Sequence, residues 1–209
     1  MTLTLHVFPP SPRAFKVLFT ANHLGIPYEM KVINLAAGEQ RTEEFAALNV
    51  NQRMPVLEED GYKLWESNAI VEYLCARKPE SGVLPQELKA RLQIVKWMYW
   101  ESAHWDPAIA IFMFERVVKK MFGRGEEIPS EIERGTVLLD RLAKVLDGEL
   151  QKHRYIAGDA LTAADLVLAG TFCHAEAARF PLEPYRAIHR WAAEMQALPA
   201  WAQTIAMQG

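Results

Sequence analysis

Residues 53–74 read RMPVLEEDGYKLWESNAIVEYL, and the first half of this stretch predicts a β-hairpin. The β-type run VLE begins immediately after Pro55, which cannot donate a hydrogen bond to a sheet and so belongs at the start of a strand. Asp60-Gly61 then favours a two-residue type I′ turn, because both central positions of that turn need a positive φ. The run YKLW returns as the second strand, so a proline leads the hairpin and a tight turn closes it.

The second half of the stretch predicts a helix whose first turn suits an anion. The pair Glu66-Ser67 opens it, and an apolar face follows at helical spacing: Ala69, Ile70, Tyr73 and Leu74. A helix N-terminus presents free N–H groups and the positive end of the helix dipole, and both attract a carboxylate. Ser67 adds a hydroxyl at the same place, so the helix start is a candidate anion site.

The chain before this stretch supplies the other elements of a small α/β domain. Alternating apolar residues at the N-terminus predict a strand that ends at a pair of prolines. A helix follows, with Pro12 in its first turn and Gly25 as its C′ cap. Residues 28–33 predict a second strand, and Thr42 is the expected N-cap of a short helix. With the hairpin and its helix, the order over residues 1–77 is β-α-β-α-β-β-α.

The chain after a breaker-rich linker, KPESGVLP at residues 78–85, predicts helices only. The first of them carries an apolar stripe, and Pro107 is expected to kink or split it because proline removes a helical hydrogen bond. The members of the stripe are Leu88, Leu92, Val95 and Tyr99. Ser130-x-x-Glu133 and Thr162-x-x-Asp165 both have the spacing of a capping box and predict two further helix starts. Residues 86–209 are therefore expected to form an all-α domain.

Composition excludes several classes of function. Half of the 209 residues are hydrophobic and 23% are charged, as in an ordinary globular protein. A net charge of −3 gives no support for binding nucleic acid or a membrane surface. No apolar run approaches the ~20 residues of a membrane span, and the N-terminus lacks a signal-peptide pattern. Cys75 and Cys173 lie far apart, which argues against a disulfide framework or a metal site. We expect a cytoplasmic protein without a metal.

Three stretches resemble the glutathione S-transferase superfamily. MPVLEEDGYKLWESNAIVEYL is similar to the second half of its thioredoxin-like domain, where a proline-led hairpin precedes E-S-x-A-I. YIAGDALTAADLVLAG, residues 155–170, is similar to a cap near the core helix of its helical domain, for which we expect a role in folding. ESAHWDPAIAIFMFERVVKKMFG resembles the corresponding helix of phi-class and related bacterial members. The resemblance implies an α/β thioredoxin-like domain, residues 1–77, followed by an all-α helical bundle, residues 86–209.

The resemblance also implies a site for glutathione as co-substrate. In that family the proline at the position of Pro55 is cis, and the backbone of the preceding residue, here Met54, pairs with the cysteinyl part of glutathione. Glu66 and Ser67 match the γ-glutamyl clamp, in which the acidic residue lies near the amine and the serine binds the carboxylate. The alternative for this pair is a plain helix N-cap.

The glycine carboxylate of glutathione is expected at three polar side chains. Gln40, Arg41 and Arg53 fall where the phi-like pattern places contacts to that carboxylate. An arginine guanidinium can bind a carboxylate through two parallel hydrogen bonds. The alternative for each is a solvated surface side chain.

The thiol activator is expected to be Ser11. Phe8 stands where tyrosine-type members have Tyr, and Pro9 stands where serine-type theta and phi members have Ser. Ser11-Pro12-Arg13 resembles the nu-type bacterial pattern Thr-Pro-Asn. Ser11 would donate a hydrogen bond to the thiolate at a helix start, where a thiol pKa falls below its usual ~8.5, and the nearby Arg13 and Lys16 would add positive potential. The alternatives are activation by backbone N–H groups and an N-cap serine without a ligand.

The resemblance implies a homodimeric transferase that adds the glutathione thiolate to a small hydrophobic electrophile. That electrophile is expected between the two domains, facing an aromatic stretch: Trp97, Tyr99, Trp100, Trp105, Phe112 and Phe114. Packing inside the helical domain explains most of these side chains equally well, so no single one is assigned to the site. His104 is a weaker polar candidate there. Two other functions stay open, a glutathione-dependent disulfide reductase and a non-catalytic glutathione-binding or protein-interaction module of the same fold.

Overall fold

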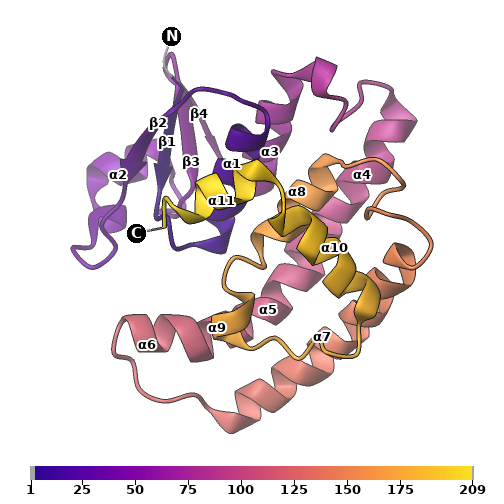
Figure 1. Ribbon diagram of the computed structural model, residues 1–209. Coiled ribbons are helices and arrows are strands. Elements are labelled where there is room, and N and C mark those ends of the chain that lie inside the picture. The colour runs from indigo at the N-terminus through magenta and orange to yellow at the C-terminus, as the bar shows by residue number, and fades with distance from the viewer. Residues whose placement is uncertain (1–2, 209) are drawn as a thin grey trace.

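The computed structural model describes residues 3–208 and places a small α/β domain against a larger set of helices (Figure 1). The elements of the first domain are β1 Thr4–Val7, α1 Pro12–His23, β2 Glu29–Val32, α2 Glu43–Leu48, β3 Val56–Glu59, β4 Tyr62–Trp65 and α3 Ser67–Ala76. The sheet order is β2-β1-β3-β4, with β1 parallel to β2 and antiparallel to β3. This arrangement confirms the predicted element order and the thioredoxin-like fold class.

The hairpin has the predicted turn and the predicted proline. Asp60 and Gly61 have φ values of 50° and 82°, as a type I′ turn requires. Glu59 pairs with Tyr62 across the turn. The Met54–Pro55 peptide bond is cis, and Pro55 immediately precedes β3. The hairpin therefore leads directly into α3, as the sequence predicted.

The helix ends that the sequence predicted at Thr42 and Gly25 are confirmed, and the one at Ser130 is not. Thr42 Oγ1 accepts a hydrogen bond from Phe45 N at 3.2 Å and caps α2. Gly25, just past α1, has a φ of 62°, which suits a C′ glycine. The box at Ser130 is wrong, because α7 begins one residue earlier at Pro129 and no side chain caps it. Proline is favoured at a first helical position because it has no N–H to leave unpaired.

The second domain is helical from α4 onward. Its helices are α4 Leu88–Trp100, α5 Asp106–Phe112, α6 Lys119–Met121, α7 Pro129–Leu150, α8 Ala163–Gly170, α9 Ala175–Ala178, α10 Arg186–Gln196 and α11 Pro199–Ile205. A π-helical turn, Glu101–Trp105, joins α4 to α5 directly before Pro107. The expected disruption at Pro107 thus takes the form of a changed hydrogen-bond pattern.

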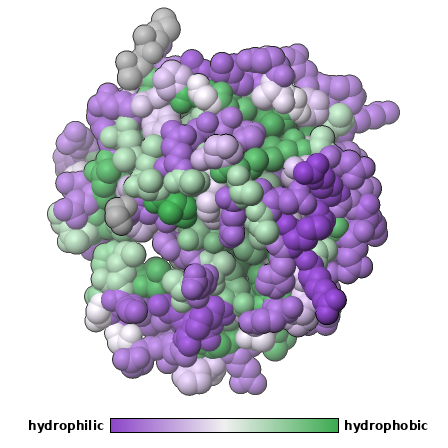
Figure 2. All heavy atoms as spheres, in the orientation of Figure 1, coloured by the Kyte–Doolittle hydropathy of each residue, from purple (hydrophilic) through white to green (hydrophobic). Residues whose placement is uncertain are grey.

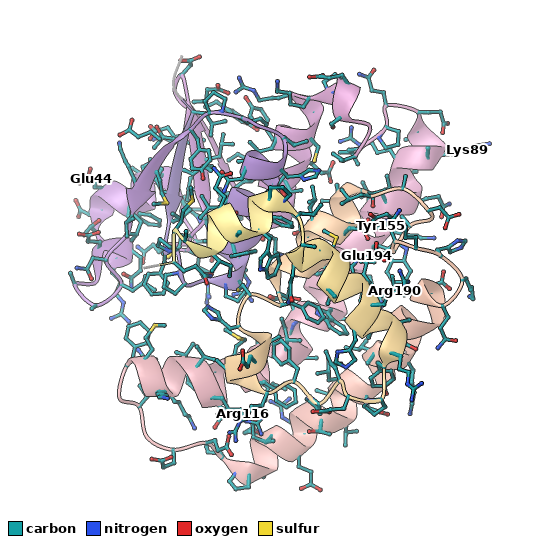
Figure 3. The ribbon with its side chains drawn as sticks, in the orientation of Figure 1. Glu44, Lys89, Arg116, Tyr155, Arg190 and Glu194 are labelled. Atoms are coloured by element: carbon teal, nitrogen blue, oxygen red, sulfur yellow. The ribbon has the colours of Figure 1, made fainter. Side chains whose placement is uncertain are left out.

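The capping box at the start of α8 is complete and buried. Asp165 accepts hydrogen bonds from Thr162 N and Thr162 Oγ1, both at 2.8 Å, and its side chain is fully enclosed. The same carboxylate accepts from Ile156 N at 2.9 Å and from Trp191 Nε1 at 3.0 Å. Figure 3 shows Arg190 and Glu194 of α10 beside Tyr155, in the loop that precedes the box. These bonds join α8, α10 and that loop, which supports the expected role in folding.

Helix α1 is the element that joins the two domains. Its Phe15 and Phe19 rings meet Trp201 of α11 at centroid distances of 4.8 and 5.5 Å, and Figure 1 shows α11 lying over α1. On another side, Gly170 at the end of α8 lies so near that a Cβ there would be 2.6 Å from Lys16 Cβ. Both domains therefore share one apolar core around α1. None of the helices between residues 3 and 208 has the length and hydropathy that crossing a bilayer needs.

Candidate functional site

A cavity of about 1090 Å³ is lined by side chains of both domains. Figure 2 shows the surface hollowed between the α/β domain and the region of α6. All eight predicted site residues line the cavity: Ser11, Gln40, Arg41, Arg53, Met54, Pro55, Glu66 and Ser67. The fold therefore brings together residues that are up to 56 positions apart in the sequence, from Ser11 to Ser67.

The start of α3 forms one wall of the cavity. Ser67 is 8% exposed, and its hydroxyl has no hydrogen-bond partner within residues 3–208. Glu66 precedes it with φ 73° and ψ 112°. A non-glycine residue in such a conformation costs ~1–3 kcal/mol and is found mainly at functional sites. The helix N-terminus and the free hydroxyl together give this wall the character of a carboxylate site.

The loop before the cis proline is held by a side chain that the sequence reasoning missed. Asn49 is buried; its Nδ2 donates to Arg53 O at 2.6 Å, and its Oδ1 accepts from Asn51 N at 2.9 Å. These two bonds shape the loop into Met54, which reaches the cavity beside Pro55. An asparagine in a loop gives no signal in sequence that distinguishes this role from a plain turn.

Three polar side chains on the cavity wall have no partner within the part of the chain that the structure describes. Arg41 and Arg53 are exposed, and neither guanidinium is in an ion pair or a side-chain hydrogen bond among residues 3–208. Gln40 Oε1 is buried and lacks a hydrogen-bond partner in the same range. Two unpaired guanidinium groups on one wall favour an anionic ligand.

Ser11 lies between β1 and α1, at the N-cap of α1. Its backbone is extended, with φ −78° and ψ 130°, and its side chain makes no capping hydrogen bond. Phe8, three residues earlier, lines the same cavity and has no hydroxyl. The free hydroxyl of Ser11 is therefore available to a group bound in the cavity.

The positive potential expected from Arg13 and Lys16 is offset by carboxylates. Arg13 forms an ion pair with Asp106, and Lys16 Nζ lies 2.8 Å from Glu101 Oε1. Asp106 and Glu101 are 93 and 85 residues away from Arg13 and Lys16 in the sequence, so no local pattern predicts these two pairs. All four side chains line the cavity, but together they bring no net charge to it.

The structure favours core packing, the alternative that the sequence left open, for most of the aromatic stretch. Of the six aromatic residues named for it, only Tyr99 lines the cavity. Trp105 and Phe112 are fully buried in the helical core, where Trp105 stacks on Phe172 at 6.1 Å. His104 is exposed and does not line the cavity. The periodicity of these residues reflects packing inside the helical domain. Helical spacing alone could not distinguish such packing from a pocket wall.

The two cysteines are poor candidates for thiol chemistry. Cys75 and Cys173 are both free. Burial raises the pKa of each thiol to about 12, whereas reactive thiols have lowered pKa values. Within residues 3–208 no group of three or more His, Cys, Asp or Glu side chains is placed to hold a metal ion.

The protein thus combines a thioredoxin-like domain with a helical domain. Its cavity is lined by a cis proline and by the start of a helix, as in a site for a small molecule. Residues 1–76 match the family model "Glutathione S-transferase, N-terminal domain", and residues 108–199 match "Glutathione S-transferase, C-terminal domain". The chain belongs to the glutathione S-transferase family.

Individual relatives agree with this assignment over almost the whole chain. A glutathione S-transferase of Hyoscyamus muticus is 29% identical over 98% of both chains. The crystal structure of a glutathione S-transferase from Pseudomonas fluorescens is 30% identical, with a TM-score of 0.85 over 96% of this chain and 97% of that one. A glutathione S-transferase-I bound with the ligand lactoylglutathione has a TM-score of 0.88 at 22% identity, over 99% of this chain and 100% of that one. The last of these shows a shared fold only.

Proposed function

We propose that this protein is a glutathione transferase that joins the thiolate of glutathione to a hydrophobic electrophile. The observation that carries the proposal is the convergence of Ser11, the Glu66-Ser67 helix start and the unpaired Arg53 on one cavity. In the reaction the thiol proton leaves to solvent and the sulfur lone pair forms a bond to carbon. A leaving group then departs with its bonding electrons, or an addition product takes a proton from water.

The cavity walls suggest how glutathione is oriented. We place the γ-glutamyl carboxylate at Ser67, with Glu66 near the amine, because the helix start favours an anion. We place the cysteinyl backbone beside Met54, and the glycine carboxylate at Arg53, Arg41 and Gln40. This orientation points the thiol toward Ser11. A glutathione conjugate held by a protein of the same fold supports the choice of ligand.

The second substrate is proposed to lie on the helical-domain side of the cavity. Phe8 from the α/β domain and three side chains of α4 supply apolar wall there: Val95, Met98 and Tyr99. Apolar walls with few polar groups are typical of sites for small molecules. We therefore retain a hydrophobic electrophile as the second substrate.

Glutathione should stabilise the wild-type protein and should largely fail to stabilise Ser67→Ala. At ~100 times its dissociation constant a ligand adds ~2.7 kcal/mol to the free energy of unfolding, and thermal denaturation with and without glutathione measures that gain. Ser102→Ala is the matched control, because Ser102 lines the same cavity from the helical domain. Equal gains in wild type and Ser67→Ala would place glutathione elsewhere.

Activity assays on the same proteins separate the functions that the sequence left open. Conjugation of glutathione to a panel of aromatic electrophiles tests the transferase. Reduction of mixed disulfides of glutathione tests the reductase. Binding of glutathione without either activity would contradict the proposed reaction and leave a binding module.

We also propose that two copies of the chain associate through α4. Leu88 and Leu92 lie one turn apart on this helix and are 66 and 51% exposed, whereas Val95 and Tyr99, farther along the same stripe, line the cavity. Sedimentation equilibrium should give twice the chain mass of 23.7 kDa, and Leu92→Glu should shift the protein toward the monomer. Val137→Glu, at a comparably exposed valine of α7, is the control. A monomeric wild type at micromolar concentration would exclude this interface.

The location that we propose is the cytoplasm. Two free cysteines, Cys75 buried and Cys173 partly buried, are typical of proteins in a reducing compartment. Fractionation of cells that express the tagged chain would test it, and recovery outside the cytoplasmic fraction would contradict it.

A further inference from the structure

The loop that carries Ser11 has very few hydrogen-bond donors of its own. Pro9, Pro10 and Pro12 surround Ser11, and proline has no backbone N–H. Within the loop, Ser11 N donates to Phe8 O at 2.9 Å. The carbonyl groups of the two prolines before Ser11 therefore need donors from elsewhere in the fold.

Those donors come from the helical domain. His174 Nε2 lies 2.7 Å from Pro10 O, and Gln208 Nε2 lies 3.4 Å from Pro9 O. Since a carbonyl oxygen only accepts, the Nε2 atom of His174 carries the hydrogen. Two residues more than 160 positions away in the sequence thus hold consecutive carbonyls of the loop.

The bond from His174 fixes the peptide plane from which Ser11 extends. The Pro10 C=O and the Ser11 N–H belong to one planar peptide unit. His174 holds the oxygen of this unit, and Phe8 O holds its N–H. Ser11 O also accepts from Phe15 N at 2.8 Å, in the first turn of α1. The backbone of Ser11 is therefore fixed on both sides, while its hydroxyl is left without a partner within residues 3–208.

His174 itself is positioned by the close packing of α8 on α1. Gly170, four residues before His174, ends α8 at the point where a Cβ would lie 2.9 Å from Lys16 Cα. Two hydrogen bonds then hold the turn that follows α8. Thr171 N donates to Leu168 O at 3.1 Å, and Phe172 N donates to Ala169 O at 2.9 Å. His174 follows directly from this anchored turn, so its ring has a defined place relative to α1.

We propose that His174 is a positioning residue for Ser11, acting across the domain interface through the Pro10 carbonyl. The inference rests on the proposed function, in which Ser11 donates a hydrogen bond to the glutathione thiolate. Loss of the imidazole removes one of the two hydrogen bonds that hold the Pro10–Ser11 peptide plane, and the bond to Phe8 O remains. The plane can then tilt, and the Ser11 hydroxyl is held less firmly toward the sulfur. Neither α3 nor Arg53 is touched by this change.

The test compares His174→Ala with His189→Ala. His189 is a matched control, because its Nε2 lies 2.9 Å from Leu182 O, also a backbone carbonyl, but within the helical domain. For His174→Ala we expect the thiol pKa of bound glutathione to rise and kcat/KM for conjugation to fall about tenfold, as small misplacements of catalytic groups do. At a pH below both thiol pKa values the dissociation constant of glutathione should stay within about twofold, since the thiol is then protonated in both proteins and the clamp is a separate site. His189→Ala should match wild type in all three measurements.

A double variant separates positioning from general destabilisation. If His174 acts through Ser11, then Ser11→Ala/His174→Ala should be no slower than Ser11→Ala, whereas independent effects would multiply. His174→Gln, which keeps a side-chain N–H donor, should recover part of the loss and also serves if His174→Ala folds poorly. Multiplying effects, or a wild-type thiol pKa in both His174 variants, would overturn the inference. A wild type that binds glutathione without lowering its thiol pKa would instead overturn the proposed function, and this inference with it.

Discussion

Replacing Lys16 by methionine is expected to lower the free energy of unfolding by ~3–5 kcal/mol, because it leaves a buried carboxylate without its partner. Lys16 and Glu101 side chains are 2% and 0% exposed, and their charged atoms are 2.8 Å apart. The Glu101 side chain is enclosed in the folded protein, so its charge would stay poorly hydrated there. Urea unfolding at equilibrium measures the loss.

The cost arises from the orphaned charge, and a second substitution should show this. In Lys16→Met/Glu101→Leu both charges are gone, and a buried pair replaced by apolar side chains is often close to neutral, so much of the stability should return. Lys144→Met is the control, because its pair with Asp140 is 68% and 50% exposed and such pairs contribute ~0–1 kcal/mol. If Lys16→Met cost no more than Lys144→Met, the buried pair would not stabilise the interface.

The same ion pair connects the domain interface to the proposed glutathione site. Asn68 follows Ser67 in α3, and its Oδ1 accepts from Lys16 Nζ at 3.1 Å. Its Nδ2 donates to Met98 O at 2.8 Å and to Glu101 Oε2 at 3.1 Å. The helix start that is proposed to bind the γ-glutamyl carboxylate is thus tied to α1 and to the helical domain. Lys16, Asn68 and Glu101 all line the cavity, so this hydrogen-bonded network forms part of its wall.

Sequence reasoning succeeded where the determining interactions are local. The Asp60-Gly61 turn and the Thr42 cap each depend on backbone conformation within a few residues. The box at Thr162 is also local, and the three-residue separation of Thr162 and Asp165 sufficed to find it. Ser130 failed because the same spacing competes with a proline, and the proline's fixed φ decided where α7 begins.

The candidate site depended on more than local pattern. The helix start at Glu66-Ser67 was predicted as an anion site from the residues alone, and the other six residues came from the family resemblance; all eight line the cavity. The ion-pair partners Asp106 and Glu101 could not be predicted from sequence, because residues so far apart in the chain form no recognisable spacing pattern. The aromatic stretch could not be assigned from sequence, because the same helical period describes both a core face and a pocket wall.

Replacing Ser11 by alanine is expected to raise the thiol pKa of bound glutathione and to slow conjugation. A hydrogen bond to a thiolate favours the charged form, so its removal raises the pKa. Loss of one donor to a developing anion often costs ~2.7–4 kcal/mol. Arg13 and Lys16 contribute little to holding the thiolate, because both are already paired with carboxylates. The N-terminus of α1 still favours an anion, so the loss in Ser11→Ala should be smaller than this range. At 1.36 kcal/mol per pH unit, a pKa rise of up to about two is therefore expected.

Thiolate absorbance against pH, with glutathione bound, measures this pKa directly. The rate loss should be largest below both pKa values and should shrink as pH rises through the pKa of the variant, because both proteins then hold the thiolate. Ser11→Thr, which keeps the hydroxyl, should lie near wild type, and Ser102→Ala controls for the loss of any serine at the cavity. If the curves for wild type and Ser11→Ala coincide while the wild-type pKa is lowered, the backbone N–H groups of α1 activate the thiol and Ser11 is only its N-cap.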